Sequence, residues 1–98
     1  MIVTETDVET YLRTRVKHFG GKCVKLPAVY EKGIPDRLVI LPGGKVAFVE
    51  LKRPRGGRLA PLQRYQILKL RELGCIAEVV NTHKAVDDLI KRMTDDEV

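Results

Sequence analysis

The sequence has few cysteines and no long apolar run, and each absence removes a class of protein. Its two cysteines, Cys23 and Cys75, do not form a Cys-x-x-Cys pair, and neither histidine completes a zinc-binding spacing with them. We therefore expect core thiols rather than zinc ligands. No segment approaches the length of a membrane span, and the first residues lack the basic and apolar regions of a secretory signal. These features favour a cytoplasmic protein.

The charge balance of the chain favours a polyanionic partner. The 98 residues form one domain, 1–98, with room for a single core, and they carry 18 Lys and Arg against 13 Asp and Glu, a net charge of +5. Three of the acids lie within residues 94–98, which we expect to be a frayed tail, so the body is more strongly basic. No segment combines a long apolar face with a basic one, so nucleic acid is favoured over a membrane surface.

Periodicity and turn residues divide the chain into helix, three strands, helix, strand and helix. The first helix begins at Thr4 or Thr6, each followed by an acid three residues later, and ends at Gly20-Gly21. The strands are expected at 22–26, 37–41, 45–51 and 75–80. A second helix runs from Pro61 to Gly74, and Asn81 or Thr82 caps the third. The apolar positions of the second helix are Leu62, Tyr65, Ile67, Leu68, Leu70 and Leu73.

This order predicts an α/β fold with a mixed four-stranded sheet. Strands 37–41 and 45–51 are joined by Pro42-Gly43-Gly44, a turn typical of a β-hairpin. A helix separates strands 45–51 and 75–80, and such a crossover implies that these two strands are parallel. The sheet should therefore be flanked by helices.

The hairpin brings together the residues that carry chemistry. It places Asp36 near Glu50, and Glu50 shares a strand face with Lys52. An acid and a lysine at the end of an otherwise buried strand are costly unless they have partners or a metal. Two carboxylates from adjacent strands suit Mg²⁺, and Lys52 would position or deprotonate an attacking water. Either motif alone has an ordinary explanation, a solvated strand end or a turn, but the two on paired strands indicate an active site.

The same residues resemble a known family. Pro35-Asp36 followed by Glu50-Leu51-Lys52 resembles the PD-(D/E)XK nuclease superfamily. The longer stretch Gly33-Ile34-Pro35-Asp36-Arg37-Leu38, with Leu41-Pro42-Gly43-Gly44, Phe48-Val49-Glu50-Leu51-Lys52 and Gln63, resembles its VRR-NUC branch over nearly the whole chain. The resemblance implies a restriction-endonuclease-like αβββαβ core with one added C-terminal helix. It also implies a DNA endonuclease that depends on Mg²⁺ or Mn²⁺.

The resemblance further implies a substrate and a cellular setting. Stand-alone phage members of the VRR-NUC branch resemble Holliday-junction resolvases, so we expect a homodimer that cuts four-way DNA junctions in a bacterial or phage-infected cell. A larger eukaryotic relative acts on flaps, which makes branched DNA the broader expectation.

Three further site residues follow from the resemblance. PD-(D/E)XK enzymes often place a glutamate in the first helix, and we prefer Glu9 to Glu5 as a catalytic, metal-binding residue. The alternative is that both belong to an acid-rich first turn, which the helix dipole favours. The carbonyl of Leu51 is expected to bind the metal. Gln63 is expected beside the metal, against the alternative of an exposed helical glutamine.

Basic residues around the motif are expected to bind DNA. Arg53, Arg55 and Arg58 follow Lys52 in a segment where Pro and Gly forbid regular structure. A run of charges is usually a solvated surface, but this one directly follows the expected catalytic lysine, so we expect it to bind phosphates. Lys32, Arg37 and Arg64 complete the expected DNA-binding set, and Tyr30 either stacks on DNA or packs within its loop.

Two other functional classes compete with the nuclease. A basic binding module would bind DNA without metal and would not cut it. A protein–protein adaptor would show no salt-dependent affinity for DNA. Both leave Asp36, Glu50 and Lys52 without an explanation.

Overall fold

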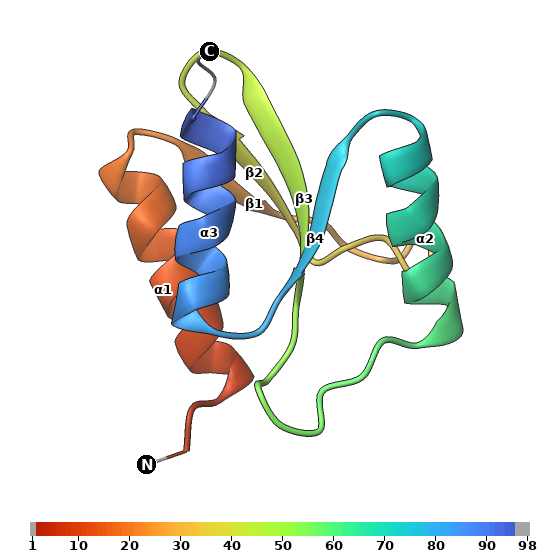
Figure 1. Cartoon of the computed structure of the whole chain (residues 1–98). Coiled ribbons are helices and arrows are strands. Elements are labelled where there is room, and N and C mark those ends of the chain that lie inside the picture. The colour runs from red at the N-terminus through yellow and green to blue at the C-terminus, as the bar shows by residue number, and fades with distance from the viewer. Residues whose placement is uncertain (1, 96–98) are drawn as a thin grey trace.

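A computed structural model describes residues 2–95 and arranges them in three layers (Figure 1). The central layer is a four-stranded sheet, with α1 and α3 on one face and α2 on the other. The elements, in chain order, are α1 Glu5–His18, β1 Lys22–Lys25, β2 Arg37–Leu41, β3 Lys45–Leu51, α2 Pro61–Glu72, β4 Ile76–Val80 and α3 His83–Thr94. The predicted element order and fold class are confirmed.

Threonine side chains determine where two of the helices begin. The Thr4 hydroxyl accepts the Asp7 N–H at 3.1 Å, and the Asp7 carboxylate accepts the Thr4 N–H at 2.8 Å. This reciprocal pair satisfies donors that a helix start leaves free, so α1 begins after Thr4 rather than Thr6. At α3 the Thr82 hydroxyl accepts the Ala85 N–H at 3.0 Å. Thr82 is therefore the cap rather than Asn81.

The strands lie in the order β1-β2-β3-β4. β1, β2 and β3 pair antiparallel, whereas β3 and β4 run parallel, as the crossover through α2 predicts. Gly43 and Gly44, with φ of 90° and 74°, make the turn between β2 and β3 in a conformation that other residues rarely adopt. The register aligns Arg37 with Val49, so the next residues outward, Asp36 and Glu50, come together at the end of the hairpin.

The hydrophobic core lies between the sheet and the α1/α3 layer. It consists of Val8, Leu12, Val16, Val39, Leu41, Ala47, Val49, Leu51, Val80, Val86, Leu89, Ile90 and Met93. On α2 only Ile67 is buried, while Leu62, Tyr65 and Leu68, and Leu73 directly after the helix, are exposed. The apolar positions of this helix therefore do not form a second core, because one helix alone covers that face of the sheet and its first turn faces polar residues.

Three other expectations need correction or limitation. Cys75 is exposed and Cys23 is only partly buried, so neither is a fully buried core thiol. Thr94 belongs to α3, where its hydroxyl donates to the Ile90 carbonyl at 2.8 Å, so the tail begins later than predicted. Residues 96–98 lie outside the part of the chain that the structure describes.

Candidate active site

Asp36 is fixed at the end of the hairpin. It lies directly before β2, and its Oδ2 accepts the backbone N–H of Leu51 at 2.9 Å. Through this side-chain bond, the residue before β2 is tied to the end of β3. Pro35, the residue before Asp36, is fully buried. The Asp36 carboxylate is thus held beside Glu50.

Glu50 is almost completely buried and is held by two side chains. It is 1% exposed. Its Oε2 accepts a hydrogen bond from Gln63 Nε2 at 3.0 Å and lies 3.3 Å from Lys52 Nζ. Its Oε1 is buried and has no hydrogen-bond partner among residues 2–95. A buried carboxylate oxygen without a partner is costly, so it indicates a group that binds there.

Gln63 lies beside Glu50, one of the residues expected to bind the metal. Its Oε1 accepts the N–H of Ala60 at 2.9 Å, at the start of α2. Since the amide oxygen is used in this way, the NH₂ group must face Glu50. Gln63 therefore completes the helix cap, for which the Ala60 side chain has no hydrogen-bonding atom, and fixes one oxygen of the glutamate.

The electrostatics of the site oppose the charged form of Glu50. Burial, and then the neighbouring Asp36 carboxylate, raise the pKa of Glu50 to about 7, although Lys52 acts in the opposite direction. Two carboxylates held together away from water are unfavourable unless a positive charge lies between them. Such a shifted pKa at a cluster of polar groups is typical of functional sites.

The donor set fits a hard divalent cation. Asp36 and Glu50 offer carboxylate oxygens from neighbouring strands, one of which is buried without a partner. Among the described residues, no group of three or more His, Cys, Asp or Glu side chains could hold a metal. Mg²⁺ normally uses one or two carboxylates and fills its shell with waters and a phosphate, so two carboxylates suffice for it. The side chains suit Mg²⁺ or Mn²⁺ better than zinc.

Glu9 and Arg37 bind each other on the opposite face of the sheet. The Glu9 carboxylate forms an ion pair with the guanidinium of Arg37, which also lies 3.5 Å from the Cys23 carbonyl oxygen. Arg37 faces α1, whereas Asp36 and Glu50 face α2, because neighbouring strand residues alternate. The structure therefore does not bring Glu9 to the carboxylate pair. Arg37 is only 9% exposed and is not available to DNA, contrary to expectation. Glu5, the alternative to Glu9, is exposed at the start of α1.

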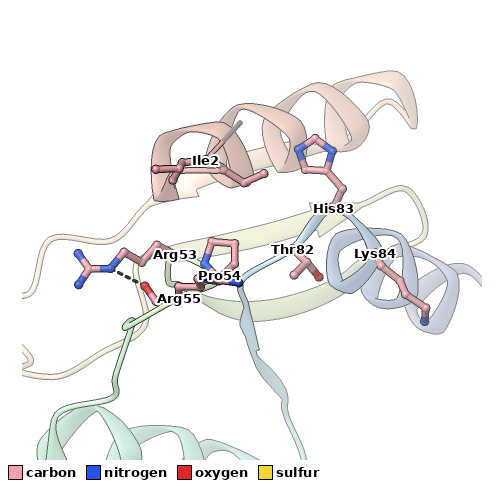
Figure 2. A pocket seen from close by; sticks show the side chains of 8 residues that line it. Ile2, Arg53, Pro54, Arg55, Thr82, His83 and Lys84 are labelled. Carbon is pink, nitrogen blue, oxygen red and sulfur yellow. Dashed lines mark hydrogen bonds between the residues drawn. The ribbon is translucent and has the colours of Figure 1, made fainter.

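The other basic residues of the predicted set are exposed. Arg53, Arg55 and Arg58 lie in the segment after β3, Lys32 lies before β2, and Arg64 lies in the first turn of α2. Arg53 also shapes its own loop, since its Nε donates to the Arg55 carbonyl at 2.7 Å (Figure 2).

Sequence reasoning missed the contacts that fix the loop before Asp36. Gln66 Nε2 donates to the Lys32 carbonyl at 2.9 Å and lies 3.3 Å from Glu31 Oε2. Gly33 has a φ of 82°, and a Cβ there would lie 2.8 Å from the Leu62 carbonyl oxygen. Only glycine fits this approach. The one signal in the sequence was that Gln66 lies one helical turn beyond Gln63.

The fold and the site together define the class of the protein. An αβββαβ core that places an aspartate and a Glu-x-Lys at the end of its hairpin is a PD-(D/E)XK nuclease core. A sequence model of the VRR-NUC domain matches residues 9–84, which include Asp36, Glu50, Lys52 and Gln63. The chain belongs to the VRR-NUC family of nucleases.

Two relatives support this assignment. Over 73 residues the chain is 38% identical to "Putative nuclease p44" of Acyrthosiphon pisum secondary endosymbiont phage 1, covering 74% of this chain and 77% of that protein. A solved structure described as a VRR_NUC domain superposes with a TM-score of 0.81 at 37% identity, covering 89% of this chain and 94% of the other. Within residues 2–95, no helix is long and apolar enough to cross a membrane.

Proposed function

We propose that this nuclease hydrolyses phosphodiester bonds in branched DNA and depends on Mg²⁺ or Mn²⁺. The observation that carries the proposal is the Glu50 carboxylate, buried beside Asp36 with one oxygen unpartnered and the other close to Lys52. A non-catalytic DNA-binding module would have no use for a buried glutamate that lies, unfavourably, beside a second carboxylate.

The carboxylates would hold the ion. Asp36 and Glu50 would bind it, and the carbonyl of Leu51 is proposed as a further ligand. When bound, the ion would supply positive charge that polarises the phosphate and stabilises charge developing on its oxygens. Asp36 already accepts a hydrogen bond from the Leu51 N–H, so the side chain and this peptide are positioned together.

Lys52 would act on the attacking water. Its ammonium group lies 3.3 Å from Glu50 Oε2, and the Lys52 side chain is 18% exposed, so it can reach solvent at the mouth of the site. There it would orient the water and offset charge on the phosphate. Gln63 would keep Glu50 in place through its 3.0 Å hydrogen bond.

The proposed substrate is a four-way junction cut by a homodimer. Residues 2–95 hold one such site, Asp36 with Glu50, and resolution of a junction requires cuts in two opposing strands. A net charge of +5 and the exposed arginines after β3 supply phosphate affinity without base recognition. A monomeric mass by light scattering at micromolar concentration, with junction cleavage retained, would contradict the dimer.

The test of the proposal is cleavage of end-labelled synthetic DNA. A four-way junction, a flap, a single strand and a linear duplex are each incubated with Mg²⁺, Mn²⁺ or EDTA. Lys52→Ala serves as the inactive variant, and Lys17→Ala, which removes the same charge from an exposed position on α1, is the matched control.

Each result has a defined meaning. Metal-dependent, symmetric nicks in the junction, lost in Lys52→Ala and kept in Lys17→Ala, would support a junction endonuclease. Cutting of flaps alone would keep the nuclease and change its substrate. Binding without cutting in any metal would contradict catalysis and favour the basic binding module.

A further inference from the structure

A cavity of about 920 Å³ lies close to the proposed active site but outside it. Ile2, Val3, Pro54, Thr82 and His83 line its interior, together with three basic residues, Arg53, Arg55 and Lys84. No carboxylate is among these lining residues. The proposed mechanism does not use this cavity, and its lining is both apolar and cationic.

The cavity lies where the chain changes from one face of the sheet to the other. β3 and β4 are parallel neighbours, with Leu51 paired to Val80 at their carboxyl ends. From β3 the chain goes to α2 on one face, and from β4 it goes to α3 on the other (Figure 1). Crevices outside the carboxyl ends of parallel strands, at such a change of direction, are preferred ligand sites. The lining residue Arg53 directly follows Lys52, so the cavity adjoins the site.

The interior of the cavity is apolar and has a fixed aromatic wall. Ile2 faces Pro54 and His83 across the hollow (Figure 2). The His83 ring stacks on Tyr11 with centroids 4.1 Å apart and an angle of 10° between planes. Tyr11 is itself held by its hydroxyl, which donates to Asp87 at 2.8 Å. Such a surface suits the sugar and base of a nucleotide better than a free phosphate.

Positive charge lies on both sides of this apolar interior. In Figure 2 the Arg53 and Lys84 side chains extend away from the hollow in opposite directions. Lys84 forms an ion pair with Asp88 at 2.9 Å, but both side chains are largely exposed, so the pair is weak and can exchange for a phosphate. The first turn of α3 adds the backbone N–H groups of His83 and Lys84, which favour an anion.

A nucleic-acid strand alternates charged phosphates with less polar nucleosides, and the cavity shows the same alternation. We propose that it binds one nucleotide of the DNA strand that continues past the scissile phosphate. The sugar and base contact Ile2, Pro54 and His83, and the phosphates on either side contact the arginine loop and the start of α3. This inference rests on the proposed function and adds a subsite that positions the strand.

The binding test does not depend on cleavage. ¹⁵N-labelled wild-type protein in EDTA is titrated with a thymidine tetranucleotide and, separately, with inorganic phosphate. We expect saturable shifts of the backbone amides of Val3, Arg55, His83 and Lys84 with the tetranucleotide and much smaller shifts with phosphate. Shifts confined to the surroundings of Lys52 and Gln63, equal shifts with phosphate, or no shifts would overturn the proposal.

A pair of charge-matched variants tests the cavity itself. Ile2→Asp places a carboxylate at the cavity, and Leu73→Asp makes the same change at an exposed position at the end of α2. We expect Ile2→Asp to weaken tetranucleotide binding about tenfold. The change removes one contact with a nucleoside and adds repulsion between the new carboxylate and the phosphates. Leu73→Asp should weaken it by about twofold or less, through net charge alone. Equal losses would overturn the proposal.

The two proposals fail separately. If the protein cleaves junctions but the amides at the cavity do not shift, the proposed subsite is overturned and the nuclease function stands. Saturable cavity shifts without cleavage in any metal would support the nucleotide site while contradicting the catalytic function. The spectrum of each variant also shows directly whether it is folded.

Discussion

The two faces of the sheet differ in what they bury. The face toward α1 and α3 buries aliphatic side chains and holds the Glu9–Arg37 ion pair at its margin. The face toward α2 buries a carboxylate, Glu50, and little apolar area beyond Ile67 and Ala77. Stability and chemistry are thus divided between the two faces. The apolar core on the α1/α3 face stabilises the fold enough to tolerate the buried Glu50 carboxylate on the α2 face.

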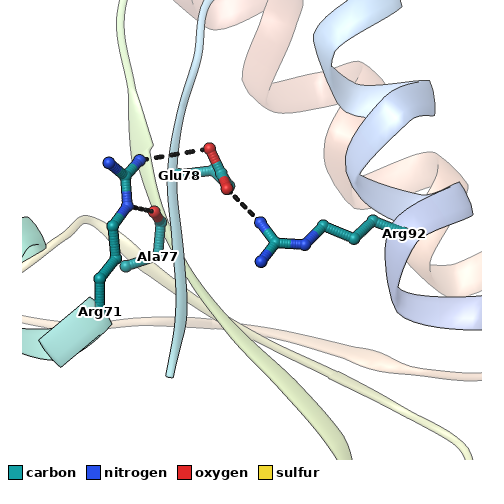
Figure 3. Close-up of polar contacts among 4 residues, drawn as sticks. All are labelled: Arg71, Ala77, Glu78 and Arg92. Atoms are coloured by element: carbon teal, nitrogen blue, oxygen red, sulfur yellow. Dashed lines mark hydrogen bonds and ion pairs between the residues drawn. The ribbon is translucent and has the colours of Figure 1, made fainter. Parts of the chain in front are cut away.

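The edge strand β4 joins the two layers. The Glu78 carboxylate lies 3.3 Å from the Arg71 guanidinium of α2 and forms a second ion pair with Arg92 of α3 (Figure 3). Arg71 Nε also donates to the Ala77 carbonyl at 2.7 Å. These contacts cover part of the strand edge, where unpaired backbone groups invite association.

The largest expected effect comes from neutralising the buried carboxylate. Glu50→Gln keeps the shape of the side chain but removes the charge that would hold a metal. We expect cleavage to fall by about 10²–10⁴-fold, as for loss of a principal catalytic group. Glu72→Gln, on the exposed side of α2, is the control and should cut normally. Cleavage near the wild-type rate in Glu50→Gln would remove Glu50 from the site.

The apolar face should carry most of the stability. Leu12→Ala removes a fully buried side chain and should lower the free energy of unfolding by about 2–5 kcal/mol. Leu68→Ala on α2, where the side chain is 52% exposed, should change it by about 0.5 kcal/mol or less. Urea denaturation measures both. Equal losses would show that α2 contributes a core of its own.

Gln63 should affect the site more than the fold. Gln63→Ala frees Glu50 from its hydrogen bond and removes the helix-cap bond to Ala60. We expect a loss of about 10–100-fold in metal affinity, as for other residues that orient a metal ligand. Isothermal titration with Mn²⁺ gives this affinity directly. Lys69→Ala, on the exposed side of the same helix, should leave it close to the wild-type value.

The smallest effect is on pH-dependent stability without metal. Because the pKa of Glu50 is raised from 4.5 to about 7, the folded state binds the proton more tightly than the unfolded state does. Stability from this group is complete below pH 4.5 and is lost as the pH rises toward 7. In EDTA, Glu50→Gln should therefore raise the melting temperature at pH 8 by roughly a few degrees. A lower melting temperature for Glu50→Gln than for the wild type at pH 8 would mean that the Glu50 charge stabilises the fold.

Much of the secondary structure could be predicted because its signals are local. The bounds of β2 and β3 follow from apolar runs around a Pro-Gly-Gly turn, and the parallel pairing of β4 follows from the helix before it. Asp36, Glu50 and Lys52 could be placed together for the same reason, since a hairpin register is a short-range feature, whereas Gln63 was expected beside them only from the family resemblance. Their part in metal binding and catalysis remains a prediction.

The sequence by itself determined the order of the elements, the parallel and antiparallel pairings and the carboxylate pair, because strand alternation and turn chemistry are encoded within a few neighbouring residues. Only the tertiary structure decided which helical side chains meet the sheet and which side chains from distant segments contact one another. It paired Glu9 with Arg37, left Leu62, Tyr65 and Leu68 of α2 and the adjacent Leu73 exposed, and assembled a cavity from Ile2, Pro54 and His83. Those outcomes depend on how distant segments pack, and helical periodicity alone does not show which apolar stripe meets a neighbour.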